Sequence, residues 1–253
     1  MSINNSYSVI LPTLNEVGHI KSLVLDISRN FNKLNLIYEI IIVDDSSTDG
    51  TIEAVSAINN SNLIIHKRFK KKKSLVDFLN EGIKLSKYEN IIWMDADYSH
   101  PPEYITEFIK KNNNTNNIDA IVCSRFLKKS KRYYENTKLR PVGIDYLSIF
   151  LNKICRLVLF DDFTDYTSGY ICIKKNIIKN IKLKGYYGDY FITLITRCKV
   201  SGNSILEIPF TEKERASGQS KTTGNKFYLI IKFYFYFIAL LTSILQKYFK
   251  FFF

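Results

Sequence analysis

The chain has 253 residues, of which 46% are hydrophobic and 24% charged, so it can bury one large core or two small ones. This size and composition exclude a disordered chain, a coiled coil and a disulfide-stabilised miniprotein. The 36 Lys and Arg residues outnumber the 24 Asp and Glu residues, giving a net charge of +12. Such an excess favours a polyanionic partner, which could be nucleic acid, an anionic membrane surface or a phosphorylated substrate.

The first half of the chain alternates short apolar runs with longer amphipathic stretches. This alternation is typical of strand-helix-strand units in a mostly parallel sheet with helices on both faces. The expected strands are Tyr7–Leu11, Tyr38–Val43, Asn62–His66, Asn90–Met94 and Asp119–Cys123. The expected helices are Glu16–Phe31, Asp49–Ile58, Ser74–Ser86 with Ser74 as its N-cap, and Pro102–Lys111, and the polar run Asn112–Asn117 is expected to be a loop.

The pattern changes after Arg125 and predicts a second half with fewer strands. Its expected elements are a basic loop at Lys128–Lys138, a helix near Ile144–Phe160, a strand at Tyr170–Ile173, a helix near Tyr190–Val200 and a strand at Ser204–Ile208. A polar segment, Thr211–Asn225, follows these elements.

The C-terminal segment Phe227–Leu245 is apolar and aromatic, and its only charge is Lys232. As a helix it would be roughly 28 Å long, close to the ~30 Å hydrocarbon thickness of a bilayer. This length and the Lys-flanked aromatic ends favour a membrane helix, either spanning or interfacial. A buried core helix is the alternative.

Acidic and turn-forming residues follow three of the expected strands. They are Asn15 and Glu16 after the first strand, Asp44 and Asp45 after the second, and Asp95 and Asp97 after the fourth. Each Asp alone could cap a helix or form a turn. Together they favour a ligand site, because ligands of open α/β sheets bind at the carboxyl ends of the strands. Clustered carboxylates suit Mg²⁺ or Mn²⁺, whose remaining positions can bind substrate phosphates.

Five segments carry recognisable motifs. They are Pro12–Glu16 (P-T-L-N-E, for the pattern P-T-Y-N-E), Val43–Gly50 (V-D-D-S-S-T-D-G, for V-D-D-x-S-x-D-G), Asp95–Glu103 (D-A-D-Y-S-H-P-P-E, for D-A-D-L-Q-H-P-P-E), Asp165–Tyr170 (D-Y-T-S-G-Y, for D-x-T-S-G-F) and Arg215–Lys221 (R-A-S-G-Q-S-K, for R-x-x-G-x-S-K). The chain thereby resembles, over roughly residues 7–225, the family 2 inverting glycosyltransferases of the GT-A fold. Within them it is most similar to the polyprenyl-phosphate sugar synthases, the dolichol-phosphate mannosyltransferases in particular.

The resemblance implies a role for each matching residue. Residues expected to line the nucleoside pocket are Pro12, Leu14, Glu16, Val43 and Asp45. Asp95 and Ala96 would contact the ribose and the diphosphate, and Asp97 would hold the metal, with Ser99 and Asp95 as further candidate ligands. Residues expected to bind phosphates are Arg125, Arg215 and Lys221, with Arg140 and Ser148 as further candidates beside Arg125 for the acceptor phosphate.

The implied reaction is transfer of a hexose, mannose from GDP-mannose, to the phosphate of a polyprenyl (dolichyl) monophosphate. It would be a single inverting displacement that depends on Mg²⁺ or Mn²⁺. A lipid monophosphate is mostly ionised near pH 7, because its second pKa is about 6. No general base is therefore required, and the expected task of Asp97, Arg125, Arg215 and Lys221 is electrostatic.

Two residues and one segment depart from the family pattern in ways that leave alternatives open. Leu14 stands where the family has Tyr, Ser99 stands where it has Gln, and Phe69–Ser74 lacks the usual glycines. UDP-glucose-dependent transfer to the same lipid is one alternative. A catalytically inactive scaffold that binds a nucleotide or a membrane is another.

Partners and location follow from the same reasoning. His100 is expected to form local hydrogen bonds rather than to bind metal, and the Lys70–Lys73 and Lys128–Arg132 runs to face a membrane or solvent rather than nucleic acid. The four cysteines form no C-x-x-C pair, which favours free thiols and a reducing compartment. The expected partners are a sugar nucleotide, a polyprenyl phosphate and a membrane, with partner subunits left open.

The expected organisation has three parts. Residues 1–124 form the sugar-nucleotide-binding half of a GT-A domain, residues 125–225 the acceptor-binding half, and residues 226–253 a membrane-associated helix. The catalytic domain is expected to face the cytosol, at the endoplasmic reticulum membrane of a eukaryote or the cell membrane of a prokaryote.

Overall fold

A computed structural model describes residues 5–68, 74–115, 117–130, 142–179, 181–213 and 226–249, and the side chains of 142–147 and 226–230 are outside the description. The strands are β1 (Ser6–Thr13), β2 (Ile37–Asp44), β3 (Leu63–Lys67), β4 (Asn90–Trp93), β5 (Ala120–Ser124), β6 (Ile171–Lys174) and β7 (Ile205–Pro209). The helices are α1 (Ile20–Lys33), α2 (Thr51–Ser56), α3 (Leu75–Leu85), α4 (Tyr104–Asn114), α5 (Val142–Val158), α6 (Lys175–Ile178), α7 (Tyr190–Val200) and α8 (Lys226–Phe249).

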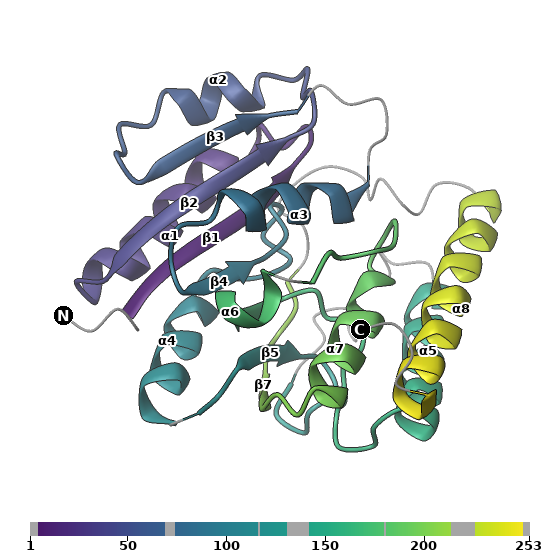
Figure 1. Cartoon of the computed structure of the whole chain (residues 1–253). Helices are drawn as coiled ribbons and strands as arrows, with labels where there is room; N and C mark the ends of the chain where they lie inside the picture. The colour runs from purple at the N-terminus through teal and green to yellow at the C-terminus, as the bar shows by residue number, and fades with distance from the viewer. Residues whose placement is uncertain are drawn as a thin grey trace.

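The strands form one sheet in the order β3-β2-β1-β4-β6-β5-β7 (Figure 1). β1 pairs in parallel with β2 and β4, β2 with β3, and β5 with β7. β6 runs antiparallel to both of its neighbours, β4 and β5. The mostly parallel α/β sheet expected from the sequence is therefore confirmed, with β6 as its one reversed strand among those described.

Helices cover both faces of the sheet, as the uninterrupted apolar strands predict. On one face, Tyr7, Val9 and Leu11 of β1 pack with buried side chains of α1 and α4. On the other face, Ile10 belongs to a second core built from α3, α5, α7 and part of α8. Alternate residues of β1 thus anchor the two layers seen in Figure 1.

Most element ends lie within a few residues of the expected ones, and two differences have a physical reason. Residues 112–114, expected in a loop, form the last turn of α4. There the amide of Asn112 donates to the Tyr7 hydroxyl at 3.2 Å and to Asn90 Oδ1 at 3.3 Å, which offsets the weak helix propensity of asparagine. The expected helix from Glu16 begins instead at Ile20, because the preceding residues bind another loop. The sequence did not predict α6. Ser74 caps α3 as expected.

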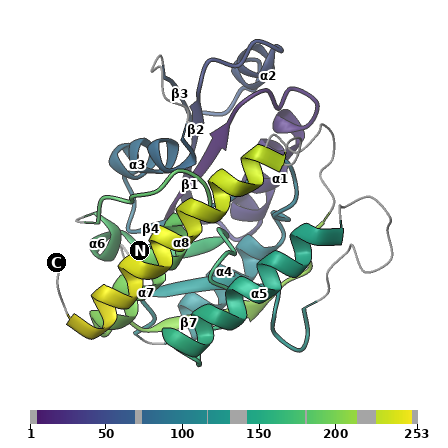
Figure 2. The ribbon, with the colours of Figure 1, turned by 90° about the vertical axis from the view of Figure 1, so that its right-hand side faces the viewer.

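The C-terminal helix α8 lies beside α5 and packs on α7 (Figure 2). Ala239 and Leu240 are buried in the core, while Phe233, Phe237 and Leu241 are 56%, 48% and 43% exposed. The Lys247 ammonium also donates to the carbonyls of Val158 and Leu159 at the end of α5. Among the residues that the structure describes, no helix combines the length and apolar character needed to cross a bilayer. α8 thus has one face in the core and one apolar face exposed.

Candidate active site

Hydrogen bonds hold two of the motif loops together at the carboxyl edge of the sheet. Four hydrogen bonds join residues 15–17, after β1, to residues 47–51, after β2. They are Asn15 N to Ser47 Oγ at 2.8 Å, Glu16 N to Thr51 Oγ1 at 2.8 Å, Val17 N to Asp49 Oδ2 at 3.1 Å and Thr48 N to Asn15 Oδ1 at 2.9 Å. The small and polar residues of both motifs thus build one rim of the site. Gly50 has φ +94°, a conformation that glycine adopts without strain.

The two carboxylates that follow β2 have different roles. Asp44 is buried and accepts hydrogen bonds from the backbone N–H and the hydroxyl of Ser47, so it shapes the turn. Asp45 is 0% exposed, and neither of its carboxylate oxygens has a hydrogen-bond partner in the described part of the chain. A buried carboxylate without a donor costs several kcal/mol. Asp45 is therefore the described acidic group that most requires a ligand.

Arg68 is a residue that the sequence analysis missed. It follows β3, is 3% exposed, and none of its guanidinium nitrogens makes a hydrogen bond within the described residues. Its guanidinium lies 4.8 Å from the ring centre of Phe78, and one nitrogen lies 3.8 Å from Asp77 Oδ2. Backbone contacts from Arg68 N to Asp44 O at 2.8 Å and from Ser46 Oγ to Arg68 O at 3.1 Å fix it beside the end of β2. The sequence signal that could have identified Arg68 is its position as a basic residue shortly after an expected strand.

The loop after β4 holds the expected metal ligands. Asp97 is 4% exposed, and its Oδ1 accepts a hydrogen bond from Ser99 N at 2.9 Å. The side chain of Asp95 is 46% exposed, and its backbone N–H donates to His100 Nδ1 at 3.0 Å. His100 stacks on Tyr170 with 4.8 Å between the ring centres. The expectation that His100 bonds locally is confirmed, and Ser99 supports Asp97 through its backbone.

The donor set of this loop fits a hard divalent cation only in part. Asp95 and Asp97 supply carboxylate oxygens, the atoms that Mg²⁺ and Mn²⁺ prefer. Within the described residues, no group of three or more His, Cys, Asp or Glu side chains could hold a metal. A cation bound here would therefore take its other ligands from a substrate diphosphate and water, which is the usual habit of Mg²⁺.

Arg125 lies at the centre of a buried ionic network. Its Nε and Nη2 donate to Asp165 Oδ2 and Oδ1 at 2.8 and 2.9 Å, and Nη2 also donates to the carbonyl and hydroxyl of Thr167 at 2.9 and 2.8 Å. Its Nη1 lies 3.6 Å from Glu212 Oε1. Burial is the largest single influence and raises the pKa of Asp165, but the charge and hydrogen bonds of the Arg125 guanidinium, together with the backbone N–H groups of Arg125 and Thr167, leave that pKa below its usual value. Arg125 thus holds the Asp165–Tyr170 turn, and Nη1 is the guanidinium nitrogen that makes no hydrogen bond to Asp165 or Thr167.

The same network brings Ser148 close to Arg125. Thr167 Oγ1 lies 3.3 Å from Ser148 Oγ and accepts a hydrogen bond from Asn152 Nδ2 at 3.0 Å. The turn reaches the carboxyl edge because β6 is antiparallel, so its first residue, Ile171, pairs with Trp93 at the end of β4. Arg125 and Ser148, which are 23 positions apart in the sequence, thereby share one cluster.

Some of the remaining expected site residues lie in the described part of the chain, and the others lie outside it. Pro12 and Val43 are register partners at the ends of β1 and β2, Ala96 is 4% exposed, and Glu16 pairs with His19 at 2.8 Å. Leu14, half-buried, lies beside them in the loop after β1. Arg140, Arg215 and Lys221 lie outside the described residues.

Comparison with known proteins identifies the family. The Glycosyl transferase family 2 model matches residues 8–182, more than half of the 253-residue chain. A Pyrococcus furiosus protein named dolichol-phosphate mannosyltransferase is 31% identical over 218 residues, which cover 86% of this chain and 59% of that protein. An uncharacterised Methanocaldococcus jannaschii protein is 28% identical over 195 residues, 73% of this chain and 79% of that one. The chain thus spans less than two thirds of the Pyrococcus relative's length.

Solved structures support the fold. Glucosyl-3-phosphoglycerate synthase from Mycobacterium tuberculosis with UDP has a TM-score of 0.69 and 17% identity, covering 95% of this chain and 80% of that one. The same enzyme with Mg²⁺ and UDP has a TM-score of 0.64 and 16% identity, covering 96% and 79%. The fold of the sheet and its flanking helices is therefore shared with these solved structures. Because the family model matches more than half of the chain, the chain belongs to glycosyl transferase family 2.

Proposed function

We propose that this protein transfers a hexose, mannose from GDP-mannose, to the phosphate of a polyprenyl monophosphate. The observation that carries the proposal is the buried Asp45, whose carboxylate has no hydrogen-bond partner among the described residues, at the edge that also holds Asp95 and Asp97. The name of the Pyrococcus relative supports the choice of sugar and acceptor.

Residues that directly follow β2 and β3 carry groups complementary to guanine. Guanine presents acceptors at O6 and N7, which an arginine fork can bind, and an N–H₂ donor at C2 beside N1–H. Arg68 supplies donors only, and Asp45 supplies acceptors only. A carboxylate can accept two hydrogen bonds from the N1–H and N2–H edge of guanine, whereas uracil offers one N–H. The pair therefore favours GDP-mannose over UDP-glucose, which stays the second candidate because the structural neighbours bind UDP.

The proposed reaction requires positively charged groups at fixed positions and does not require a general base. The acceptor phosphate is already ionised and attacks the anomeric carbon directly. A cation bound to Asp97 would neutralise the leaving diphosphate. We assign to the Arg125 cluster the task of orienting the acceptor phosphate, because Asp165 and Glu212 fix the guanidinium in place before the acceptor arrives. Arg215 and Lys221 would add positive charge on the donor side.

The membrane contact is proposed on the exposed face of α8. Phe233, Phe237 and Leu241 present apolar area there, and the +12 chain suits an anionic bilayer surface. We assign this face an interfacial position, with the catalytic edge on the cytosolic side where a sugar nucleotide is available. A lipid acceptor would then enter from the bilayer beside α5 and α8.

A panel of radiolabelled sugar nucleotides tests the proposal. The purified protein is incubated with GDP-mannose, UDP-glucose or GDP-glucose and with dolichyl or undecaprenyl phosphate, and label is measured in the organic phase. Label from GDP-mannose only is expected. Label from UDP-glucose alone would replace the donor assignment, and nucleotide binding without any transfer would favour the inactive scaffold.

A further inference from the structure

Two separate elements hold the loop after β4, residues 95–103. The turn before β6 holds it through His100, which accepts a hydrogen bond from Asp95 N and stacks on Tyr170. Helix α1 also bonds to the loop, although α1 contains none of the expected site residues. The roles assigned above leave these contacts of α1 unexplained.

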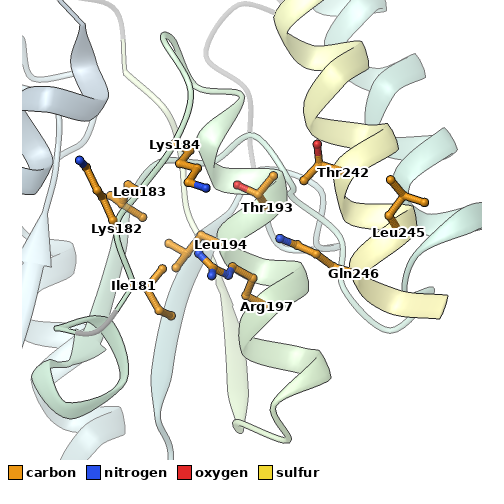
Figure 3. Close-up of a pocket in the computed structure, with 10 residues that line it drawn as sticks. All are labelled: Ile181, Lys182, Leu183, Lys184, Thr193, Leu194, Arg197, Thr242, Leu245 and Gln246. Atoms are coloured by element: carbon orange, nitrogen blue, oxygen red, sulfur yellow. The ribbon is translucent and has the colours of Figure 1, made fainter. Parts of the chain in front are cut away.

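The cavity shown in Figure 3 does not involve this loop. It has a volume of about 350 Å³ between α7, the C-terminal part of α8 and residues 181–184. None of its described lining residues belongs to α1 or to the loop after β4. The cavity thus offers the loop no support, whereas α1 contacts it directly.

Two side chains of α1 bind the loop. Asp26 Oδ2 accepts a hydrogen bond from the Tyr98 hydroxyl at 2.8 Å, and the amide of Asn30 donates to the Pro102 carbonyl at 2.8 Å. Asp26 and Asn30 are four positions apart, so they lie on one face of the helix. Arg29 orients Asp26, because its Nη1 donates to Asp26 Oδ1 at 2.7 Å. One face of α1 therefore fixes the loop at two points.

The first of these points lies beside the expected cation ligand. Tyr98 has φ +66°, a left-handed conformation that is unfavourable for a residue with a Cβ. Across this residue, Ser99 N donates to Asp97 Oδ1 at 2.9 Å. The hydrogen bond to Asp26 and an edge-on ring contact with His19, 6.3 Å between the ring centres, offset the strain at Tyr98. The orientation of the Asp97 carboxylate is thereby coupled to α1.

The hydroxyl of Tyr98 can be removed separately from the packing of its ring. Tyr98 is half-buried against the apolar side chains of the α1 and α4 layer. A phenylalanine would keep this packing and lose only the bond to Asp26. The Leu of the motif pattern at this position could not make that bond either, so it is a feature of this chain.

We propose that Asp26 and Tyr98 form a latch that holds Asp97 in position for a divalent cation and so sets how strongly the cation assists nucleotide binding. Both are positioning residues, because they act through the backbone on either side of Tyr98 and not on the cation or the nucleotide. The inference rests on the role proposed above for Asp97. Removing a group that orients a metal ligand typically weakens metal binding by tenfold or more.

Calorimetric titration with GDP, with and without Mn²⁺, tests the latch. Mn²⁺ should tighten GDP binding by the parent by about tenfold or more, since a cation on Asp97 would also bind the diphosphate. Most of this gain should be lost in Tyr98→Phe, because Asp97 is no longer held in place. The affinity for GDP without Mn²⁺ should stay within about twofold of the parent. A general loss of stability would instead weaken both.

The matched control is Tyr7→Phe. The Tyr7 hydroxyl also takes part in a hydrogen bond, from the Asn112 amide at 3.2 Å, but Tyr7 pairs with Asn90 at the end of β4 opposite the loop. This variant removes the same atom and should retain the full gain from Mn²⁺. Equal gains in the parent and Tyr98→Phe, or equal losses in the two variants, overturn the proposal.

Asp26→Ala tests the other half of the latch. Alanine favours the helix, so α1 should persist. The variant should lose the same gain from Mn²⁺ as Tyr98→Phe, and the double variant should lose no more than either single variant, because one contact is removed in all three. Losses that add in the double variant would show that the two residues act independently and would contradict the latch.

Parallel titrations with UDP separate failure of the latch from failure of the proposed function. If Mn²⁺ tightens binding of neither GDP nor UDP by the parent, the cation role of Asp97 is wrong and the latch is wrong with it. If Mn²⁺ tightens UDP binding alone, the donor assignment changes, and loss of the gain in Tyr98→Phe with UDP still supports the latch. If the parent responds and Tyr98→Phe responds equally, only the latch is wrong.

Discussion

At the scale of single residues, the site is distinguished by charges that the fold leaves unsatisfied. Asp44 and Asp45 are neighbours in sequence and both buried, yet only Asp44 has hydrogen-bond donors within the described residues. Arg68, directly after β3, carries the opposite charge, and its guanidinium makes no hydrogen bond within the described residues, although one nitrogen lies 3.8 Å from Asp77 Oδ2. Buried charges are ordinarily paired, so this pattern indicates groups preorganised for a ligand at some expense of stability.

Asp45→Asn should separate binding from folding. The amide is nearly isosteric and removes a buried charge, so the free energy of unfolding should stay within about 1 kcal/mol of the parent or rise. GDP binding should weaken by about tenfold or more, since a neutral amide cannot accept two hydrogen bonds as strongly. Urea unfolding and titration with GDP measure the two effects. A variant that unfolds early but binds GDP normally would make Asp45 a structural residue.

Asp97→Asn tests the cation ligand. Asparagine keeps the oxygen that accepts from Ser99 N, so the loop should hold its shape and circular dichroism should not change. Transfer activity should fall by about a hundredfold or more, because a neutral amide is a poor ligand for a hard divalent cation. EDTA should inactivate the parent, and Mg²⁺ or Mn²⁺ should restore it. Full transfer activity of the variant in EDTA would show that the reaction does not depend on a metal.

At the scale of secondary-structure elements, the antiparallel strand β6 determines how the second half meets the first. It returns the chain so that Asp165–Tyr170 precedes the strand at the carboxyl edge, where Arg125 binds it. The sequence predicted the strands and helices well, because apolar runs and amphipathic periods are local signals. It could not predict the direction of β6, the contact of Arg125 with Asp165 or the burial of Arg68, because these depend on which segments meet in space.

The Asp165–Arg125 pair should control stability in acid. Since the folded-state pKa of Asp165 lies below its usual 3.8, its contribution is fully present above about pH 4 and is lost as the pH falls through and below that value. Asp165→Asn leaves Arg125 buried without its main partner and should cost about 3–5 kcal/mol at pH 7. The difference between parent and variant in urea unfolding should shrink as the pH falls below about 4.

The matched control for this pair is Asp162→Asn. Asp162 pairs with Lys199, but its side chain is 68% exposed, so removing its charge should cost less than about 1 kcal/mol. If Asp162→Asn and Asp165→Asn destabilise the protein equally at pH 7, or if the Asp165 difference grows as the pH falls below about 4, the buried pair is not the acid-sensitive element.

At the scale of the whole molecule, α8 connects the core to the outer surface. The sequence allowed a membrane helix or a core helix, and the structure combines features of both, since Ala239 and Leu240 pack in the core while aromatic side chains point outward. The Lys247 contacts with the end of α5 fix the two helices side by side. Deleting α8 would therefore uncover α7 and disturb the fold, so membrane binding has to be tested on the outer face alone.

The triple variant Phe233→Ser, Phe237→Ser, Leu241→Ser tests the outer face of α8. These side chains are 56%, 48% and 43% exposed, so the substitutions should alter the free energy of unfolding little. If the face inserts into the lipid interface, each loses roughly 1 kcal/mol of apolar burial, and binding to anionic vesicles should fall by tenfold or more. Leu25→Ser, Leu34→Ser is the control, because both residues belong to α1 or its end and are 42% and 43% exposed. Flotation should be unchanged for this control, and GDP titration unchanged for both variants. Equal flotation of the triple variant and the parent would show that the bilayer does not contact this face, and long-chain acceptor would then have to reach Arg125 by another route.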